Sequence, residues 1–323
     1  MTSMRLFNGL WLLFVLLSTY SHWSNAALPH FEPSMTPQEA ALVSSAFFDG
    51  IGLARTAAVL FGCSARDPYF NRYFAEADSA FVKHMFRTLA AVPLDFDATG
   101  VDINDLLAYL QGLSADTLND NFDQLSISYG THPAVPQQAR QDNGLDCTID
   151  PELTGFMWRS APDPTNYLSL CPLIFTTFYS ISDTLHPPPT LNGVPGLTCD
   201  GLGDHETDYM ETPGLTVLHE LMHWPALFRN VPDYATKIRP TRPGQLPLIG
   251  DYSNPGGNPS NGYGPFRTHL VRDLPDVNGF SESLNNADNY AWYATLKMWS
   301  FYCDGKYFGP ATSDADFRRR EPP

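Results

Sequence analysis

The segment Thr212–Trp224 (TPGLTVLHELMHW) decides how the fold of this chain is interpreted. Thr212 is a favourable helix N-cap and Pro213 suits the first helical position, so a helix is predicted from here to about Phe228. The segment also supplies the apolar residues that a buried helix needs, namely Val217, Leu218, Leu221 and Met222.

This predicted helix carries an H-E-x-x-H pattern at His219, Glu220 and His223. Histidines at i and i+4 lie one turn apart on one helix face, so both imidazoles can reach a single ion. Zinc lowers the pKa of a bound water to about 7, and a carboxylate beside it can then take the proton as the water attacks a carbonyl. The pattern therefore predicts a zinc site with Glu220 as general base.

A catalytic zinc needs a third protein ligand, and the sequence restricts the choice. The longer metzincin pattern requires a histidine where this chain has Arg229, so that class is excluded. Glu282 is the glutamate candidate downstream. Aspartates are more numerous after the motif: Asp233, Asp251, Asp273, Asp276 and Asp288.

Two further segments give the chain a resemblance to a known family. Tyr263-Gly264 and, later, Asn286–Tyr290 (NADNY) follow the H-E-x-x-H pattern, which is similar to the aspzincins, the deuterolysin and peptidyl-Lys metalloendopeptidase group of secreted, mostly fungal zinc proteases. The resemblance is clearest over residues 147–303. It implies an α+β, zincin-like fold, with His219, His223 and an aspartate as zinc ligands. It also implies that Tyr263 hydrogen-bonds the developing oxyanion.

The chain departs from the family pattern G-T-x-D-x-x-Y-G at the position of its aspartate, which is Ser260 here. Either of two other aspartates can take the place of the family's aspartate if this chain has an insertion between His223 and Tyr263. Asp233 has nearly the family spacing from His223, but after Pro232 it also suits a helix cap or turn. Asp251 ends the apolar segment 246–250 and lies nearer the Tyr-Gly pair. We expect Asp251 to be the third ligand, with Asp233 as the alternative.

Other residues near these motifs are given structural roles. Asp288 is predicted to be the N-cap of a last helix that ends at Tyr302. Asn286 and Asn289 are expected to serve packing and turn geometry. Trp224 is expected to form a wall of the cleft, and Cys147 and Cys171 are similar to the disulfide-flanked segment of the family.

The rest of the chain predicts helices first and strands next, which is an α+β order. A capping box at Thr36–Glu39 begins a helix that we expect Gly50 and Gly52 to interrupt before it resumes to Leu60. The segments 67–89 and 102–113 are predicted as helices. Aromatic and other large apolar residues predict strands over 155–160 and 168–179.

The predicted organisation has four parts. Residues 1–26 have a short positive start, an apolar run and a polar end, which is typical of a signal peptide cut after Ala26. A helical region, 27–145, is expected to pack on a catalytic region, 146–306. Residues 307–323 form a tail. The chain is therefore expected to be secreted, without a membrane partner once the signal is removed.

Composition narrows the partners further. The 323 residues include 19 Lys+Arg and 35 Asp+Glu, a net charge of −16, so nucleic acid is not an expected partner. Five cysteines in an oxidising compartment predict disulfide bonds, with at least one cysteine left over. Their pairing and the oligomeric state stay open.

Two hypotheses follow from the motif and its departures. The first is a secreted zinc endopeptidase acting on proteins or peptides through water activated by zinc and Glu220. The alternative is a non-proteolytic, secreted zinc-binding antigen or effector on the same fold. The altered aspartate motif favours the second, and the intact Glu220 favours the first.

Overall fold

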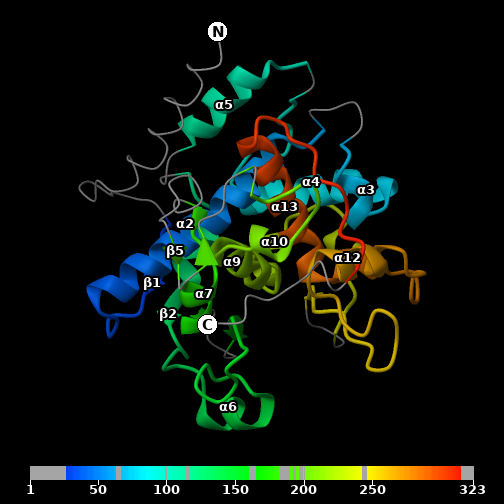
Figure 1. The fold of residues 1–323 in the computed structure, drawn as a ribbon. Helices are drawn as coiled ribbons and strands as arrows, with labels where there is room; N and C mark the ends of the chain where they lie inside the picture. The colour runs from blue at the N-terminus through cyan, green and yellow to red at the C-terminus, as the bar shows by residue number, and fades with distance from the viewer. Residues whose placement is uncertain are drawn as a thin grey trace.

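The computed structural model describes residues 27–62, 67–98, 100–113, 117–159, 165–181, 190–191, 194–195, 199, 201–241 and 246–313. Within these residues the protein consists of helices, which dominate Figure 1, and a small four-stranded sheet, so the predicted α+β class is confirmed. The predicted signal peptide and Cys63 lie outside the described residues.

The sheet is mixed, with one antiparallel edge strand. In spatial order its strands are β1 (His30–Phe31), β2 (Leu125–Tyr129), β4 (Asn166–Leu170) and β3 (Gly155–Arg159). The first three are parallel, and β3 runs antiparallel to β4 with Gly155 opposite Leu170. The predicted strand over 155–160 is confirmed for 155–159, and Ser160 lies outside the described residues. Strands β5 (Thr190–Leu191) and β6 (Val194–Pro195) form a separate pair.

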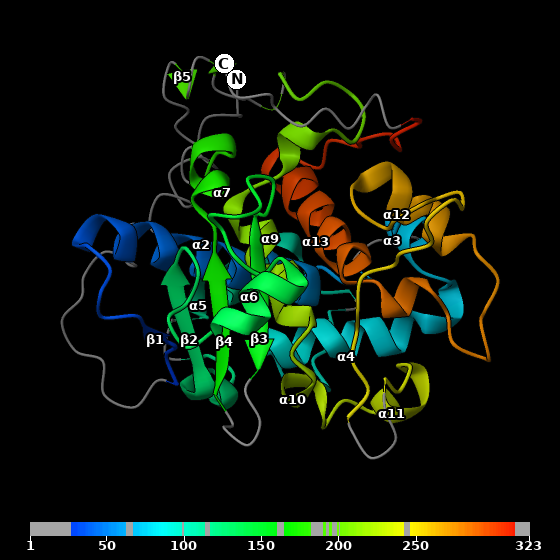
Figure 2. The ribbon, with the colours of Figure 1, turned by 90° about the horizontal axis from the view of Figure 1, so that it is seen from below.

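Helices lie on both faces of the four-stranded sheet (Figure 2). The α-helices are α2 (Pro37–Val59), α3 (Phe70–Tyr73), α4 (Ser79–Leu89), α5 (Ile103–Gly112), α6 (Gln137–Asn143), α7 (Pro172–Thr177), α9 (Pro213–Met222), α10 (Pro225–Phe228), α11 (Tyr234–Lys237), α12 (Pro265–Arg272) and α13 (Ala287–Tyr302). Helix α6 covers the face opposite α2 and α9, with Ala139 in a small apolar cluster with Phe156 of β3.

The predicted strand over 168–179 is wrong beyond Leu170. The chain leaves the sheet at Cys171 and forms α7, with Pro172 at its first position. A proline has no N–H to donate to a strand ladder, but the first turn of a helix does not need that donor. The apolar run therefore divides between a strand and a helix.

The predicted interruption of the first helix is also wrong, because α2 is continuous through both glycines. A Cβ at Gly50 would lie 3.0 Å from the carbonyl oxygen of Gly214 at the start of α9. Likewise, a Cβ at Gly214 would lie 2.7 Å from the Cβ of Asp49. These two glycines therefore allow α2 and α9 to approach closely.

The helix predicted over 102–113 is confirmed by α5, which has Asp102 as its N-cap. The helix predicted over 67–89 is instead broken into two. After α3 the chain is extended at Phe74 before a 3₁₀ turn and α4. The Phe74 ring is fully buried, 4.9 Å between centroids from Tyr290 of α13. Packing against α13 overrides the helical pattern at this point.

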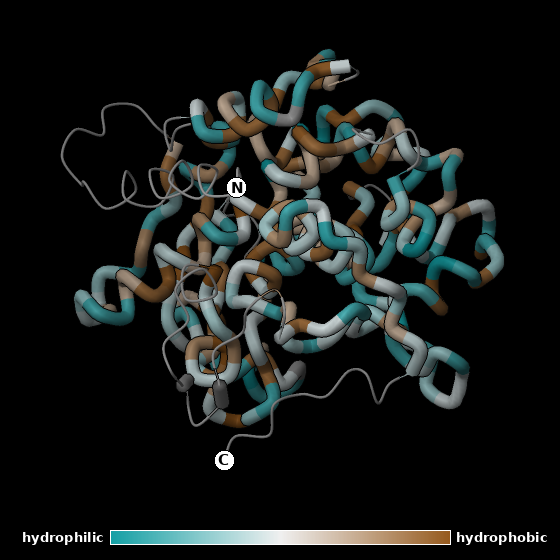
Figure 3. Tube along the Cα trace, turned by 45° about the horizontal axis from the view of Figure 1, so that its top comes forward, coloured by the Kyte–Doolittle hydropathy of each residue, from teal (hydrophilic) through white to brown (hydrophobic). Residues whose placement is uncertain are grey.

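One hydrophobic core joins the N-terminal helices to α9 and α13. It includes Phe47, Phe86, Leu218 and Trp292, all at most 1% exposed. By length and composition α2 could cross a membrane, but 72% of its most apolar window is buried inside the protein, as in a core helix. Most hydrophilic stretches follow the outer helices and loops (Figure 3).

Two disulfide bonds fix loops around this core. Cys147 pairs with Cys171, and Cys199 pairs with Cys303 at the end of α13. Both are compatible with an extracellular protein. The segment after α13 packs back on the core, since Phe308 is fully buried and the Glu206 N–H donates to the Gly309 carbonyl at 2.9 Å.

Candidate metal centre

The helix that carries the H-E-x-x-H pattern begins as predicted and ends earlier. The Thr212 hydroxyl caps the Leu215 N–H, and Pro213 occupies the first position. The helix stops at Met222, so the prediction of a helix to Phe228 is wrong: α10 is separate. Pro225 disfavours helical backbone at the residue before it, and Trp224 has φ −103° and ψ 89°.

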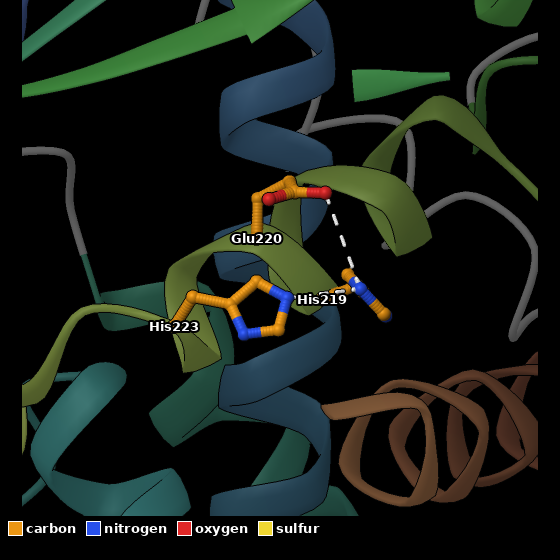
Figure 4. A group of neighbouring side chains, drawn as sticks. All are labelled: His219, Glu220 and His223. Atoms are coloured by element: carbon orange, nitrogen blue, oxygen red, sulfur yellow. Dashed lines mark hydrogen bonds and ion pairs between the residues drawn. The ribbon is translucent and has the colours of Figure 1, made fainter. Parts of the chain in front are cut away.

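His219 and His223 point their Nε2 atoms at each other across 3.2 Å (Figure 4). His219 lies in the last turn of α9 and His223 is the residue that caps it. With Zn–N bonds of about 2.0–2.1 Å, two ligands of a tetrahedral zinc lie about 3.3 Å apart. The pair therefore has the separation that one tetrahedral ion requires.

Each histidine is held through its other ring nitrogen. Nδ1 of His223 lies 2.8 Å from the carbonyl oxygen of Ile249, and Nδ1 of His219 lies 2.6 Å from Asp288 Oδ1. Acceptors at Nδ1 favour the tautomer with its proton there, which leaves the Nε2 lone pair for a metal. Both imidazoles are thus oriented as metal ligands.

Asp251 completes a set of three donors. Its carboxylate oxygens lie 3.1 Å from Nε2 of His219 and 3.5 Å from Nε2 of His223. Burial opposes ionisation, but the charges of His219 and His223 and hydrogen bonds from His219 and Tyr263 hold the pKa of the Asp251 carboxyl well below its usual value. A carboxylate ligand must be ionised, and this environment keeps it so.

The structure brings Asp251 to the histidines and places the other aspartate elsewhere. Asp233 is exposed at the N-cap of α11, where its electrostatic partner is His84. The glutamate candidate is also occupied elsewhere, since Glu282 pairs with Arg239 at 2.6 Å.

The insertion between Asp251 and the Tyr-Gly pair forms a hairpin, which we call the site hairpin (residues 251–263). Ser253 pairs antiparallel with Asn261, and the Gly262 N–H donates to the Tyr252 carbonyl at 2.9 Å. The two ends of the hairpin therefore lie side by side. Asp251 and Tyr263 meet at its base, and Tyr263 hydrogen-bonds Asp251.

Tyr263 lies beside His219, with 6.0 Å between ring centroids, and is 45% exposed. Burial, followed by the charges of Asp251 and Asp288, raises the pKa of the Tyr263 hydroxyl far above its usual value. Tyr263 thus stays protonated at neutral pH and can donate a hydrogen bond to a bound group.

Glu220 is the acid–base candidate. It is 6% exposed, and its Oε1 lies 4.0 Å from Nε2 of His219 (Figure 4). Burial raises the pKa of the Glu220 carboxyl, and the two histidines and a hydrogen bond from the Met157 N–H only partly oppose this. With His219 and His223 it forms a group whose ligand atoms lie within 4.8 Å of one another and could hold a metal ion.

The chain was also compared with known proteins. No family model matches it, and no curated protein matches it either. The assignment of a function therefore depends on the geometry of the metal centre.

Two sequence predictions for this region are wrong. Asp288 is not an N-cap: Asn286 occupies that position, and Asp288 lies 5% exposed in the first turn of α13. Its carboxylate turns instead to His219 and to the Gly264 N–H, at 2.6 and 2.8 Å. Trp224 is fully buried near Phe122, with 6.2 Å between ring centroids, and so belongs to the core.

Asp288 changes the electrostatics of the centre as well as its geometry. Burial lowers the pKa of His219, but the nearby carboxylates of Asp251 and Asp288 outweigh burial and raise it well above its usual value. The imidazole therefore also binds a proton at Nε2, which an incoming metal ion would displace. Sequence reasoning missed this role because a position next to a helix start is also typical of a cap. The NADNY segment was the one signal that marked the residue.

Proposed function

We propose that the protein is a secreted, zinc-dependent endopeptidase of the aspzincin type, with a zincin-like fold. The observation that carries the proposal is the convergence of three donors on one point. The two Nε2 atoms of His219 and His223 are 3.2 Å apart, and one carboxylate oxygen of Asp251 lies 3.1 Å from the first and the other 3.5 Å from the second. Two histidines and one carboxylate leave a fourth position open, as catalytic zinc sites do.

His219, His223 and Asp251 would hold the ion. When bound, zinc would supply Lewis-acid polarisation of a carbonyl and a water of lowered pKa. Glu220 would then accept the proton of the attacking water and deliver it to the amine that leaves. Its raised pKa makes the Glu220 carboxylate a better proton acceptor than an ordinary glutamate.

Tyr263 would stabilise the charge that develops on the substrate oxygen. It lies next to His219, remains protonated and is partly exposed at the base of the site hairpin. A neutral donor aimed at a developing oxyanion typically contributes about 10²–10³-fold to kcat. The hydroxyl would exchange its hydrogen bond to Asp251 for one to the substrate.

The sheet edge beside Glu220 supports a peptide as substrate. β3 is an edge strand whose partner among the described strands is β4. The Met157 N–H of β3 donates to Glu220, so the carboxylate lies along the edge that β4 does not use. An extended peptide can add to such an edge through its main chain, which would place a scissile bond near Glu220.

The test combines zinc content with proteolysis on protein secreted without added metal. Wild type is expected to hold about one zinc per chain and to cleave casein. Glu220→Gln should keep its zinc and lose activity, because it removes the proton acceptor and leaves the three ligands in place. Asp251→Asn should lose zinc, and Asp233→Asn is the matched control that should not.

Each alternative has its own result. Zinc retained by wild type without proteolysis of any substrate tried would indicate the non-proteolytic zinc-binding protein. If Asp233→Asn loses zinc and Asp251→Asn retains it, Asp233 and not Asp251 is the third ligand. Wild type without zinc, even after supplementation, would overturn the metal centre itself.

A further inference from the structure

The start of α13 contacts His219 of α9, Gly264 and both ends of the site hairpin. Asp288 binds His219 Nδ1 through one carboxylate oxygen and the Gly264 N–H through the other. Gly264 directly follows Tyr263. A single buried carboxylate thus joins the metal-binding helix α9 to the segment that carries the tyrosine.

Asn286, two residues earlier, holds the site hairpin from its base. Its Oδ1 accepts from the Tyr252 N–H at 3.0 Å, and its Nδ2 donates to the Gly262 carbonyl at 3.0 Å. Tyr252 and Gly262 are the neighbours of Asp251 and Tyr263. The Gly250 backbone also pairs with the start of α13, where the Ala287 N–H donates to the Gly250 carbonyl at 3.0 Å.

These contacts connect α9 to the two ends of the site hairpin, which belong to different segments of the chain. The donors come from a helix, its cap and a hairpin, and Nε2 of His219 must lie near 3 Å from Asp251 for both to bind one ion. Asn286 is fully buried and cannot shift without displacing both hairpin ends. Asp288 cannot turn without releasing the His219 imidazole.

We propose that Asp288 and Asn286 are positioning residues that hold His219, Asp251 and Tyr263 in the arrangement that binds the metal. This inference rests on the proposed metal centre and adds the groups outside it that fix its geometry. Carboxylate or amide partners behind metal ligands typically contribute about 10- to 100-fold in metal affinity.

A purely structural role would look different. Two other buried carboxylates pair with cations: Asp78 with Lys237 at 2.6 Å and Glu282 with Arg239 at 2.6 Å. Asp288 instead pairs with an imidazole and a backbone N–H. Asp288→Asn has the same shape but cannot accept at both atoms, so either His219 or Gly264 loses its partner.

The experiment measures metal binding and stability separately on the full secreted chain. Zinc affinity is measured by competition with a chromogenic chelator, and the visible absorption of the cobalt-substituted protein reports ligand geometry. Urea unfolding of the metal-free protein gives its stability. Asp288→Asn is compared with Glu282→Gln, a matched loss of one buried carboxylate away from the centre, and with Asn286→Ser.

We expect Asp288→Asn to lower zinc affinity about 10- to 100-fold and to change the cobalt spectrum, while Glu282→Gln leaves both unchanged whatever its stability. Wild-type affinity and spectrum in Asp288→Asn would overturn the positioning role and leave the metal centre standing. Equal losses of affinity in Glu282→Gln would also overturn it, since affinity would then follow stability alone.

Two further outcomes are decisive. If Asp288→Asn does not fold, Asn286→Ser takes its place: a 10-fold or greater loss of zinc affinity supports the inference, and wild-type affinity overturns it. If wild type binds neither zinc nor cobalt, the inference and the proposed function both fail. The wild-type measurement therefore separates the two failures.

Discussion

Two buried histidine–carboxylate clusters lie on either side of the first turn of α13. One is the candidate metal centre, and the other, which we call the Glu206 cluster, consists of Arg72, Glu206 and His269. Glu206 is completely buried, forms an ion pair with Arg72 and lies 2.9 Å from Nε2 of His269. Asn289 of α13 lies between the two, because its Nδ2 donates to the carbonyls of Tyr73 and Thr268, the sequence neighbours of Arg72 and His269, while its Oδ1 accepts from Asn286 Nδ2 at 2.7 Å.

The difference lies in what balances the carboxylate. In the Glu206 cluster an arginine supplies the opposite charge, and Arg72 also donates to the Phe308 carbonyl at 2.8 Å, so the cluster ties the C-terminal segment to α3. In the metal centre, the ion pairs that the described residues form with Glu220, Asp251 and Asp288 involve histidine alone. The positive charge beside these carboxylates is therefore carried by histidine, whose Nε2 proton a metal ion would replace.

The comparison teaches that similar residue types serve different purposes according to their charge balance. A buried carboxylate with an arginine partner is complete and contributes to the fold. Carboxylates and imidazoles that converge without such a partner could exchange a proton for a metal ion. The substitutions below are expected to separate these two behaviours.

The largest effect is expected from the metal centre. His219→Ala should abolish stoichiometric zinc binding, because it removes one of the three proposed ligands. The loss of zinc affinity should exceed the about 100-fold expected when only a hydrogen-bond partner behind a ligand is removed. Zinc per chain, measured by elemental analysis, checks this. Zinc retained at one per chain would remove His219 from the ligand set.

The next effect concerns the Glu206 cluster and should be one of stability. Glu206→Gln is expected to lower the free energy of unfolding by about 3–5 kcal/mol, because it leaves Arg72 buried without its charge partner. Urea unfolding of the metal-free chain measures the loss. The folded variant should bind zinc as tightly as wild type, and a large loss of zinc affinity would show that the two clusters act as one.

The smallest effect tests how the hairpin joins the centre. A Cβ at Gly262 would lie 2.6 Å from the Asn286 amide, so Gly262→Ala should cost about 1–3 kcal/mol through overpacking and also weaken zinc binding. Gly250→Ala is the matched control in the same region, because a Cβ there meets no atom within 4 Å. It should change stability by no more than about 0.5 kcal/mol. Equal effects of both substitutions on zinc binding would contradict the inference that Asn286 holds the site hairpin in place.

Much of the fold could be predicted where local patterns agree with packing. The helix over 102–113 and the strand over 155–160 were predicted from short-range signals, and the structure has α5 and β3 there. The failures share a cause. Gly50 looks like a helix breaker, yet α2 is continuous there. The role of Gly50 is to leave room for α9, which packs too closely for a side chain at this position. Phe74 lies within a helical sequence pattern, but its backbone is extended because its ring packs on α13.

The sequence by itself determined that two histidines and a glutamate lie together, because an i, i+4 spacing at the end of one helix places them within reach of one another. It narrowed the third donor to two aspartates. Only the tertiary structure chose Asp251, through a hairpin and an apolar segment that bring it back to His219.

Only the tertiary structure also revealed Asp288, whose carboxylate meets His219 from 69 positions along the chain. Local spacing fixes contacts within a helix turn, where backbone geometry leaves few choices. Contacts between distant segments depend on how whole elements pack and on how loops close, and no short-range pattern encodes these. The chemistry of this centre was therefore predictable from its helix, and its geometry was decided by the start of α13.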